Sequence, residues 1–338
     1  MTFRLCFWTA TVFCPVWAAE NFPTPKQIEW IVSGRDHVLE RRFESADSVF
    51  QSFIDTHPHH PSGYFYQAAT LTVASRGCEV SQSDTTASWA LSRAIDAAER
   101  YVAANPADRW ASFFLGCSLG LEGTYLAHNG RYWSAFWKAR RGVRILEQIV
   151  EVDSSFADAY LGLGVWRFWS SHAARNVIWL PFLEDTRAQG LDDLKRCMTQ
   201  SVLSSSMAES MLVWAYIANE EFVSAERLAS EAVGRHPSGR SMRWAKAEAL
   251  KGLEMWPLAW VEFEAALNTF SLIERHCHGA IELLFKTGEA AFMAGEVDRA
   301  QAALDEFLGY ETSEDLDDLF VPMTKDAQRM LSAIDELN

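Results

Sequence analysis

Apolar residues recur along this chain at helical spacing, and Val and Ile do not alternate with polar residues as they do in strands. The pattern therefore predicts helices throughout. A small residue is also followed repeatedly by a second small residue at one of two distances. Twelve residues separate four pairs, in which only Val213 is not small: Gly34–Ala46, Val213–Ala225, Ala247–Ala259 and Gly288–Ala300. Twenty-six residues separate three others: Ala68–Ala94, Gly116–Gly142 and Gly164–Gly190.

The first of these segments has further residues of a helical repeat. Six positions follow the order aromatic, small, aromatic, small, aromatic and helix-ending proline: Trp30, Gly34, Phe43, Ala46, Phe50 and Pro58. This arrangement resembles the repeat of the tetratricopeptide repeat (TPR) family, where the two small residues mark the closest approach of paired helices. Pro106 and Pro237 follow Ala94 and Ala225 at the same distance as Pro58 follows Ala46, and proline ends a helix.

The central repeats are longer. The small positions 46, 94, 142 and 190 recur every forty-eight residues, which is the usual thirty-four plus fourteen. Fourteen residues make about four helical turns, so a gain of about seven in each helix keeps both apolar faces in phase. His128, Asn129 and Gly130 predict a tight turn between two tall helices, whereas Arg76 to Thr86 predicts a loop in the preceding repeat.

These patterns predict an all-α fold, a right-handed α-solenoid of about seven TPR-like helix pairs with the second to fourth elongated. Residues 24–338 form one superhelical domain, and an amphipathic helix from Thr324 to Leu337 caps its open end. Acidic residues that predict a solvated loop precede the cap at Glu311, Glu314, Asp315, Asp317 and Asp318. The expected repeats lie near 27–60, 61–108, 109–156, 157–205, 206–239, 240–280 and 281–338.

The first eighteen residues have the features of a cleavable signal peptide. Arg4 precedes an apolar run from Leu5 to Val16, and small residues near Ala18 suit a signal peptidase. The run is too short to span a membrane, for which about twenty apolar residues are needed. We therefore expect an exported protein, either periplasmic or secreted. A hydrophobic N-terminal helix that stays attached is the alternative.

The cysteines and histidines give weak signals. Removal of the leader leaves Cys78, Cys117, Cys197 and Cys277, which lack a short paired spacing and are expected to be free, buried cysteines. Cys277 lies between two histidines, but three consecutive side chains on a helix cannot readily share one metal ion. Three histidines, at 57, 59 and 60, also flank Pro58 in a turn. We expect no metal and no cofactor.

The charge of the chain disfavours nucleic acid as a partner. Asp and Glu number 45 against 30 Lys and Arg, which gives a net charge of −15, whereas nucleic-acid binding needs a basic surface. One stretch is different, because basic and aromatic residues alternate in it: Arg131, Tyr132, Trp133, Phe136, Trp137, Lys138, Arg140, Arg141 and Arg144. This stretch suits an acidic or aromatic partner or anionic lipid head groups. The other interpretation is that its aromatic residues pack against the next repeat.

The fourth repeat has a second resemblance. Its segments 157–164 and 179–191 are similar to the elongated repeats of TPR proteins that include fungal inclusion-body-clearance proteins. That resemblance implies a non-enzymatic repeat protein linked to lipid bodies or membranes. Independently, Pro181 predicts a break before a second helix that begins near Asp185 or Thr186.

No phosphate loop, nucleophile elbow, zinc-protease helix or Cys-x-x-Cys motif occurs in the sequence. We therefore expect a non-enzymatic scaffold that binds a protein or peptide through its concave surface. The alternative is a carrier of a lipid or small hydrophobic ligand held between the tall central helices. Groove-facing positions on first helices are predicted at Tyr64, Gln67, Arg109, Ser112, Tyr160 and Trp166.

Overall fold

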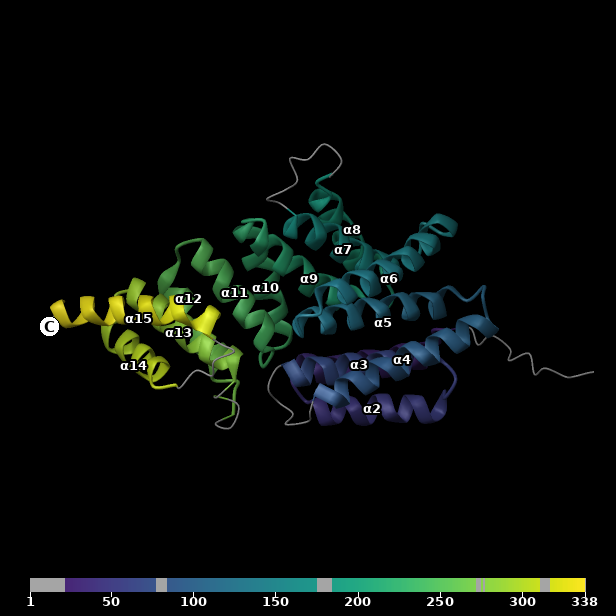
Figure 1. Cartoon of the computed structure of the whole chain (residues 1–338), viewed down its shortest axis with the longest axis horizontal. Helices are drawn as coiled ribbons and strands as arrows, with labels where there is room; N and C mark the ends of the chain where they lie inside the picture. The colour runs from purple at the N-terminus through teal and green to yellow at the C-terminus, as the bar shows by residue number, and fades with distance from the viewer. Residues whose placement is uncertain are drawn as a thin grey trace, which may run out of the picture.

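The structure is a computed structural model that describes residues 22–76, 84–174, 184–271, 275, 277–310 and 317–337. The predicted signal peptide, residues 1–18, lies outside these ranges. Within them the chain is built from helices and has no strand. The helices lie side by side along the long axis of the molecule, with α15 at the far left of Figure 1.

Fourteen of the described helices follow one another as consecutive pairs. The first four pairs are α1 (Pro25–Leu39) with α2 (Phe43–Thr56), α3 (Pro61–Arg76) with α4 (Asp84–Ala104), α5 (Arg109–His128) with α6 (Tyr132–Val152), and α7 (Tyr160–Ala173) with α8 (Arg187–Gln200). Three further pairs follow: α9 (Ser205–Ala218) with α10 (Phe222–Arg235), α11 (Arg240–Gly252) with α12 (Trp256–Leu267), and α13 (His278–Met293) with α14 (Val297–Leu308). A 3₁₀ turn, η1 (Ala157–Ala159), precedes α7, and α15 (Asp317–Leu337) ends the stack. The chain is thus a TPR-like α-solenoid, as predicted.

Local sequence explains where the first helix begins. Thr24 caps α1, because its backbone N–H donates to Gln27 Oε1 at 2.8 Å and its hydroxyl accepts from the Gln27 N–H at 3.4 Å. Pro25 follows at the first helical position, where a missing N–H costs nothing. Asp108 caps α5 in the same way, since its carboxylate accepts from the Ala111 N–H at 3.0 Å.

Small residues stand where paired helices touch. A Cβ added to Gly142 of α6 would lie 2.5 Å from the carbonyl oxygen of Gly116 in α5. One added to Gly190 of α8 would lie 2.8 Å from the carbonyl oxygen of Gly164 in α7. Larger side chains would push the backbones apart at these crossings, so the spacing of small residues in the sequence is the spacing of helix contacts.

The third pair has the predicted elongation. Its first helix, α5, ends twelve residues after Gly116, whereas α9 ends five residues after Val213. Its second helix, α6, begins ten residues before Gly142, whereas α10 begins three residues before Ala225. Each helix therefore gains seven residues, and Gly130, with φ of 69°, lies in the turn that joins them.

The second and fourth pairs differ from the prediction. In the second pair α3 extends through Arg76 and α4 begins at Asp84, so the ends of the predicted loop are helical, and residues 77–83 lie outside the described ranges. In the fourth pair α7 and α8 have 14 residues each, and α8 begins three residues before Gly190, as in a short repeat; residues 175–183 lie outside the described ranges. The two described helices are therefore no longer than α9 and α10, and the predicted elongation of this pair is not seen within the described ranges. Thr186 does stand at the N-cap of α8, as expected from Pro181.

The last helix closes the stack. Phe320, Ala327 and Ile334 of α15 are buried in the clusters that α13 and α14 form. The helix begins at Asp317, seven residues before the predicted start, because Phe320 adds an apolar contact one turn earlier. Asp317 and Asp318 therefore belong to the helix and not to the predicted loop.

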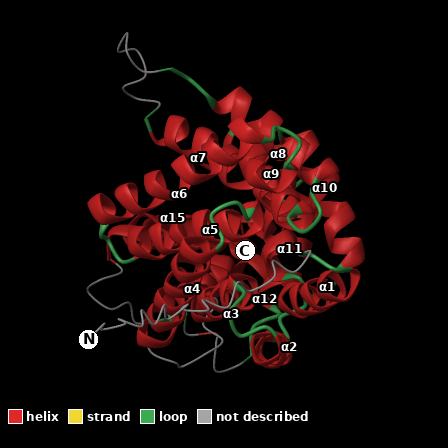
Figure 2. Cartoon of the chain, turned by 90° about the vertical axis from the view of Figure 1, so that its right-hand side faces the viewer, coloured by secondary structure: helices red, strands yellow, loops and turns green. Residues whose placement is uncertain are grey.

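The first pair also contacts the later repeats. Glu40 lies in the turn between α1 and α2, and its carboxylate is 3.8 Å from His236 Nδ1 at the end of α10. The guanidinium of Arg41, in the same turn, lies 5.9 Å from the ring of Phe270, which follows α12. In the end-on view of Figure 2, α1 and α2 project onto the same lower right side of the molecule as α11 and α12. The stack therefore curves until its beginning touches its fifth and sixth pairs.

The cysteines fall into two groups. Cys117 and Cys197 are free, as expected, and burial raises the pKa of the Cys197 thiol to about 12. Cys277, at the N-cap of α13, is disulfide-bonded, and its partner lies outside the described ranges. The expectation that Cys277 is free was therefore wrong, since cysteines far apart in sequence can meet when the stack curves.

Candidate partner-binding surfaces

Two of the six predicted groove residues are buried. Tyr160 is 8% exposed, its hydroxyl donates to the Ser154 carbonyl at 3.2 Å, and the Arg196 guanidinium stacks 4.2 Å from its ring centre. Gln67 is 6% exposed, and its amide donates to Asp47 and Gln51 of α2. Both side chains join neighbouring helices, so the prediction that they face a groove is wrong.

The other four also make contacts within the stack. The Tyr64 hydroxyl donates to the Pro58 carbonyl at 2.9 Å, and the Ser112 hydroxyl donates to the Asp108 carbonyl at 3.1 Å. Arg109 pairs with Asp153, and Trp166 is half-buried with its ring centre 5.6 Å from that of Phe136. These residues lie on first helices as predicted. The Trp166 contact joins two repeats, the Arg109 pair lies within the third repeat, and the Ser112 bond lies within α5.

One apolar cluster, which includes Tyr160 and against which Trp166 packs, runs through the first four pairs. It includes Ile31, Phe53, Phe113, Phe114 and Leu163, each no more than 1% exposed. Side chains of this size fill the space between successive first helices. Spacing alone does not reveal that filling, because the same helical phase serves a groove and a core.

A different set of first-helix residues is left partly uncovered. Seven apolar side chains, here called the first-helix strip, occur at intervals of three or four residues on three successive first helices. They are Leu161, Val165 and Trp169 of α7, Met207, Met211 and Trp214 of α9, and Trp244 of α11. Met207 is 45% exposed, the other six are half-buried, and α9 contacts both α7 and α11.

Charged side chains continue this face on α11 and α13. Lys286 lies 2.7 Å from Glu248 and 3.6 Å from Glu282, and Lys251 pairs with Glu289. The Trp244 indole N–H donates to Glu248 at 3.0 Å, which joins the strip to the charged residues. Burial opposes the charge on Lys286, but the neighbouring glutamates outweigh it and raise its pKa. The face thus changes from apolar to charged along the stack.

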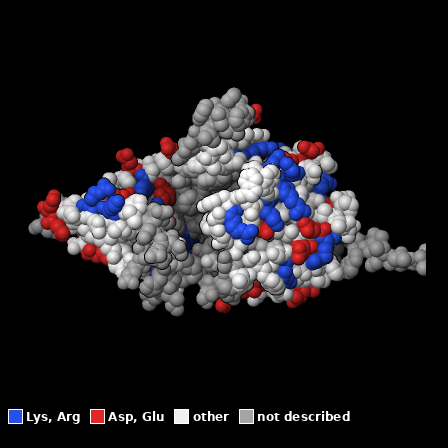
Figure 3. Space-filling model, in the orientation of Figure 1, with Lys and Arg blue, Asp and Glu red and all other residues white. Residues whose placement is uncertain are grey.

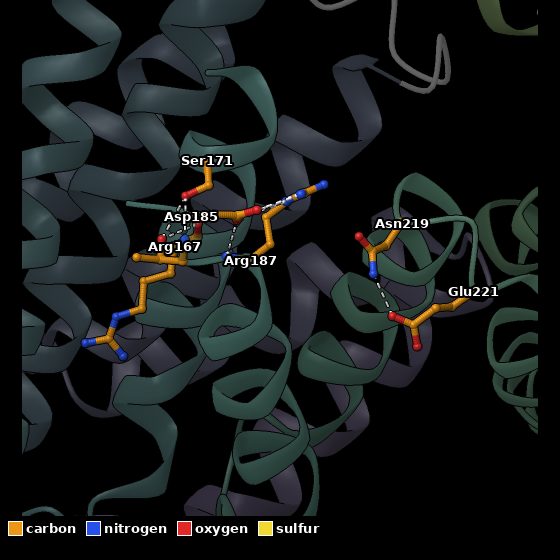
Figure 4. Close-up of polar contacts among 7 residues, drawn as sticks. Arg167, Ser171, Asp185, Arg187, Asn219 and Glu221 are labelled. Carbon is orange, nitrogen blue, oxygen red and sulfur yellow. Dashed lines mark hydrogen bonds and ion pairs between the residues drawn. The ribbon is translucent and has the colours of Figure 1, made fainter. Parts of the chain in front are cut away.

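Polar contacts fix the entry to α8. The Thr186 hydroxyl donates to the Arg167 carbonyl at 2.9 Å and lies 2.8 Å from the Ser171 hydroxyl. Asp185 accepts from the Arg187 side chain, and farther along Asn219 donates to Glu221 at 2.7 Å (Figure 4). Asp158 has a similar role, since its buried carboxylate accepts from the backbone N–H groups that follow α8, at 2.9 Å each. These groups stabilise connections between helices.

The basic and aromatic stretch lies at the start of α6. Four of its rings, here called the aromatic surface, are largely exposed: Tyr132 at 73%, Trp133 at 75%, Phe136 at 45% and Trp137 at 50%. Their ring centres are close, at 5.6 Å for Trp133 with Trp137 and 5.2 Å for Phe136 with Trp137. Among the described residues of the next repeat, ring contacts with this surface are made by Trp166 alone, through Phe136. Packing against that repeat therefore does not cover the aromatic surface.

The basic residues of the stretch are partly neutralised. Lys138 pairs with Glu122 at 2.7 Å, Arg141 with Glu99 at 2.7 Å and Arg140 with Glu147 at 3.1 Å. Arg131 and Arg144 are exposed and have no ion pair with any described residue. Figure 3 shows most of the visible Lys and Arg over the right half of this face, where Figure 1 draws α3 to α8.

The paired helices of the third and fourth repeats touch at their small residues. In the third pair a Cβ on Gly123 would lie 3.0 Å from the Ala135 carbonyl oxygen, in addition to the contact of Gly116 with Gly142. Gly164 and Gly190 make the corresponding contact in the fourth pair. A ligand held between the helices of either pair would have to separate backbones that already touch.

The His60 side chain contributes to packing. His60 is 5% exposed, stacks on Phe22 at 4.1 Å, and its Nδ1 lies 2.8 Å from the Ser62 hydroxyl. Burial, with a smaller effect of His57, lowers the pKa of His60 to about 3.

Among the described residues, no three His, Cys, Asp or Glu side chains are grouped as metal ligands. No helix in the described ranges combines the length and the low polarity that crossing a membrane requires.

No protein-family model matches the sequence, and no curated protein matches it. Solved structures of TPR proteins align with it. One is the C-terminal part of a TPR repeat-containing protein from Cytophaga hutchinsonii, at 14% identity and a TM-score of 0.41 over 85% of this chain and 98% of that one. Another is yeast Tom70, at 10% identity and a TM-score of 0.35 over 91% of each chain. The repeat architecture itself rests on the helix pairs and small-residue contacts described above.

Proposed function

We propose that this chain is a non-enzymatic scaffold that binds a protein or peptide partner along the inner face of its first helices. The first-helix strip is the observation that carries the proposal. Seven apolar side chains on three adjacent helices are only partly covered, although three of them are tryptophans and two are methionines. Such residues are enriched where proteins bind other proteins.

The chemistry of the strip defines what it would bind. Its apolar part, centred on Met211 and Trp214, suits hydrophobic side chains of a partner segment. The adjoining charged part, with Lys251 and Lys286 beside glutamates, suits a polar or charged continuation of that segment. An extended or helical peptide lying across α7, α9, α11 and α13 would meet both, and several shallow contacts would share the recognition.

Capture of the partner tests this proposal. The protein is tagged at its C-terminus, expressed in its native host and purified, and the proteins that elute are identified by mass spectrometry. We expect one stoichiometric partner. Replacing Met211 and Trp214 with Ala should weaken its binding about tenfold or more, as loss of a central aromatic contact does.

The matched control is Val223→Ala, because Val223 is 71% exposed on the second helix α10. This variant should bind the partner as the parent does. Circular dichroism melting shows that each variant folds. Equal binding by the parent and the double variant, with both folded, would contradict the use of this face.

We also propose that the scaffold acts outside the cytoplasm. The N-terminal sequence supports this, and so does the disulfide at Cys277, since structural disulfides form in oxidising compartments. Intact mass of the protein from its native host tests the proposal. Cleavage after Ala18 should give a chain that begins at Ala19, and retention of the first eighteen residues would contradict it.

A further inference from the structure

We propose that the aromatic surface of α6, together with its arginines, binds the head-group region of an anionic lipid bilayer. This inference is separate from the protein-binding role of the first-helix strip, because it concerns the second helices. It starts from an exposed cluster that the repeat does not use for packing.

The packing of α6 explains why these rings are not needed for contact with α5. The face of α6 that meets α5 is formed by small and aliphatic residues, including Ala135, Gly142, Val143 and Leu146, all buried. The four rings occur in the two additional turns at the start of the helix, where short second helices have not yet begun. The elongation of the repeat thus supplies the surface.

The order of residues along the outer face is regular. At intervals of four residues, one row runs Tyr132, Phe136, Arg140, Arg144, and the neighbouring row runs Trp133, Trp137, Arg141. Two turns of aromatic residues are therefore followed by two turns of arginine on one side of the helix.

The preceding second helix repeats part of this order. Trp89 and Arg93 of α4 lie forty-eight residues before Trp137 and Arg141, which is the spacing of the elongated repeat. Trp89 is 56% exposed, with the Arg93 guanidinium 4.5 Å from its ring centre. Arg141 of α6 also pairs with Glu99 of α4, so the two helices are adjacent. The same aromatic and basic pair occurs at the same register on neighbouring helices.

Charge complementarity favours an anionic partner. The chain carries a net charge of −15, yet Arg131 and Arg144, at the two ends of the rows, are exposed and have no acidic partner among the described residues. Basic side chains near a membrane surface are attracted by anionic lipids.

The shape and composition favour a bilayer over a peptide. Each of the four rings is at least 45% exposed, so they project outward and do not line a pocket. Trp and Tyr are enriched at membrane interfaces, where the ring contacts lipid and its N–H or O–H stays in the wet head-group layer. Arginines beside them meet lipid phosphates, as in helices that lie on a membrane surface.

The inference is tested by vesicle binding of the purified full chain. Its N-terminal residue is determined first. Vesicles of phosphatidylcholine alone are compared with vesicles that also contain phosphatidylglycerol, by co-sedimentation and by tryptophan fluorescence. We expect binding to the anionic vesicles that weakens with salt. The double change Trp133→Ala and Trp137→Ala should reduce it about tenfold or more, since it removes two interfacial anchors. Arg131→Ala with Arg144→Ala should reduce the preference for phosphatidylglycerol.

Val152→Ala is the control on the same helix, because Val152 is 82% exposed but lies at the other end of α6. It should leave vesicle binding unchanged, as should Trp214→Ala in the first-helix strip. The exposed rings can be removed without opening the core, so melting temperatures should stay close to that of the parent. Absence of binding to phosphatidylglycerol vesicles would overturn the inference. Binding that does not change in the Trp133 and Trp137 double variant would overturn it too, and so would a protein partner that requires these rings while vesicles do not bind.

Discussion

The contact between α5 and α6 predicts opposite effects for the same substitution at two glycines. Gly142 and Gly234 both lie in second helices, in α6 and α10. A Cβ at Gly142 would meet the Gly116 carbonyl oxygen at 2.5 Å and the Leu119 Cβ at 3.2 Å, whereas a Cβ at Gly234 has no atom within 4 Å. Gly142→Ala therefore adds a methyl group to a closed contact, and Gly234→Ala adds one to open space.

The expected magnitudes follow from two terms. Ala is favoured over Gly in a helix by about 1 kcal/mol, which applies at both sites. At Gly142 the 2.5 Å contact is well below the 3.0 Å that real Cβ atoms keep, and its nearest atom is backbone, so the helices must separate at a cost of about 2–3 kcal/mol. The free energy of unfolding should fall by about 1–2 kcal/mol for Gly142→Ala and rise by about 0.5–1 kcal/mol for Gly234→Ala.

Thermal and urea unfolding followed by circular dichroism measure both variants against the parent. For a chain of this size the melting temperature changes by roughly 2–4 °C for each kcal/mol. A lower midpoint for Gly142→Ala and a higher one for Gly234→Ala is the expected result. If Gly142→Ala proved as stable as Gly234→Ala, the close approach of paired helices at small residues would be refuted.

Three further predictions concern buried groups. Asp158→Ala leaves two backbone N–H groups without their acceptor and should lower the free energy of unfolding by about 2–3 kcal/mol, measured by urea unfolding. The pKa of His60 is about 3 in the folded chain and 6.5 when unfolded, so below pH 6.5 only the unfolded chain binds the proton. Stability should therefore fall as pH falls, by about 2 kcal/mol between pH 7 and pH 5, and His60→Phe should remove that part of the slope. After loss of the first eighteen residues, Cys117 and Cys197 should be the two thiols that titrate in denaturant without reductant. Addition of reductant should make all four cysteines titrate. Four thiols without reductant would contradict the disulfide at Cys277.

Much of the fold can be read from the sequence, because helix contacts impose a local rule. The pairs Gly116–Gly142 and Gly164–Gly190 show where backbones touch, and the additional fourteen residues of the third repeat divide equally between α5 and α6. The ends of α4 and α15 were less predictable. An apolar residue such as Phe320 extends a helix when a neighbouring helix covers it, and that neighbour is not visible in the local sequence.

The candidate sites were harder to predict, since burial depends on how the stack curves. Tyr160 and Trp214 both lie on first helices, yet Tyr160 is enclosed by the cluster of the first four pairs while Trp214 remains partly uncovered. The contact of Arg41 with Phe270 joins residues more than two hundred positions apart, which no repeat pattern indicates. The exposed rings of α6 were recognised in sequence, but the Trp89 and Arg93 pair was missed. Comparing positions forty-eight residues apart would have found it.

Site-specific photo-cross-linking tests the proposed binding face most directly. A photoreactive amino acid replaces Met207, the most exposed residue of the first-helix strip, or Val223 on the second helix α10 as the control. After irradiation in the native host, we expect one discrete cross-linked protein from position 207 and none from position 223. Cross-linking to the same protein from position 223 but not from position 207 would contradict partner binding along the first helices.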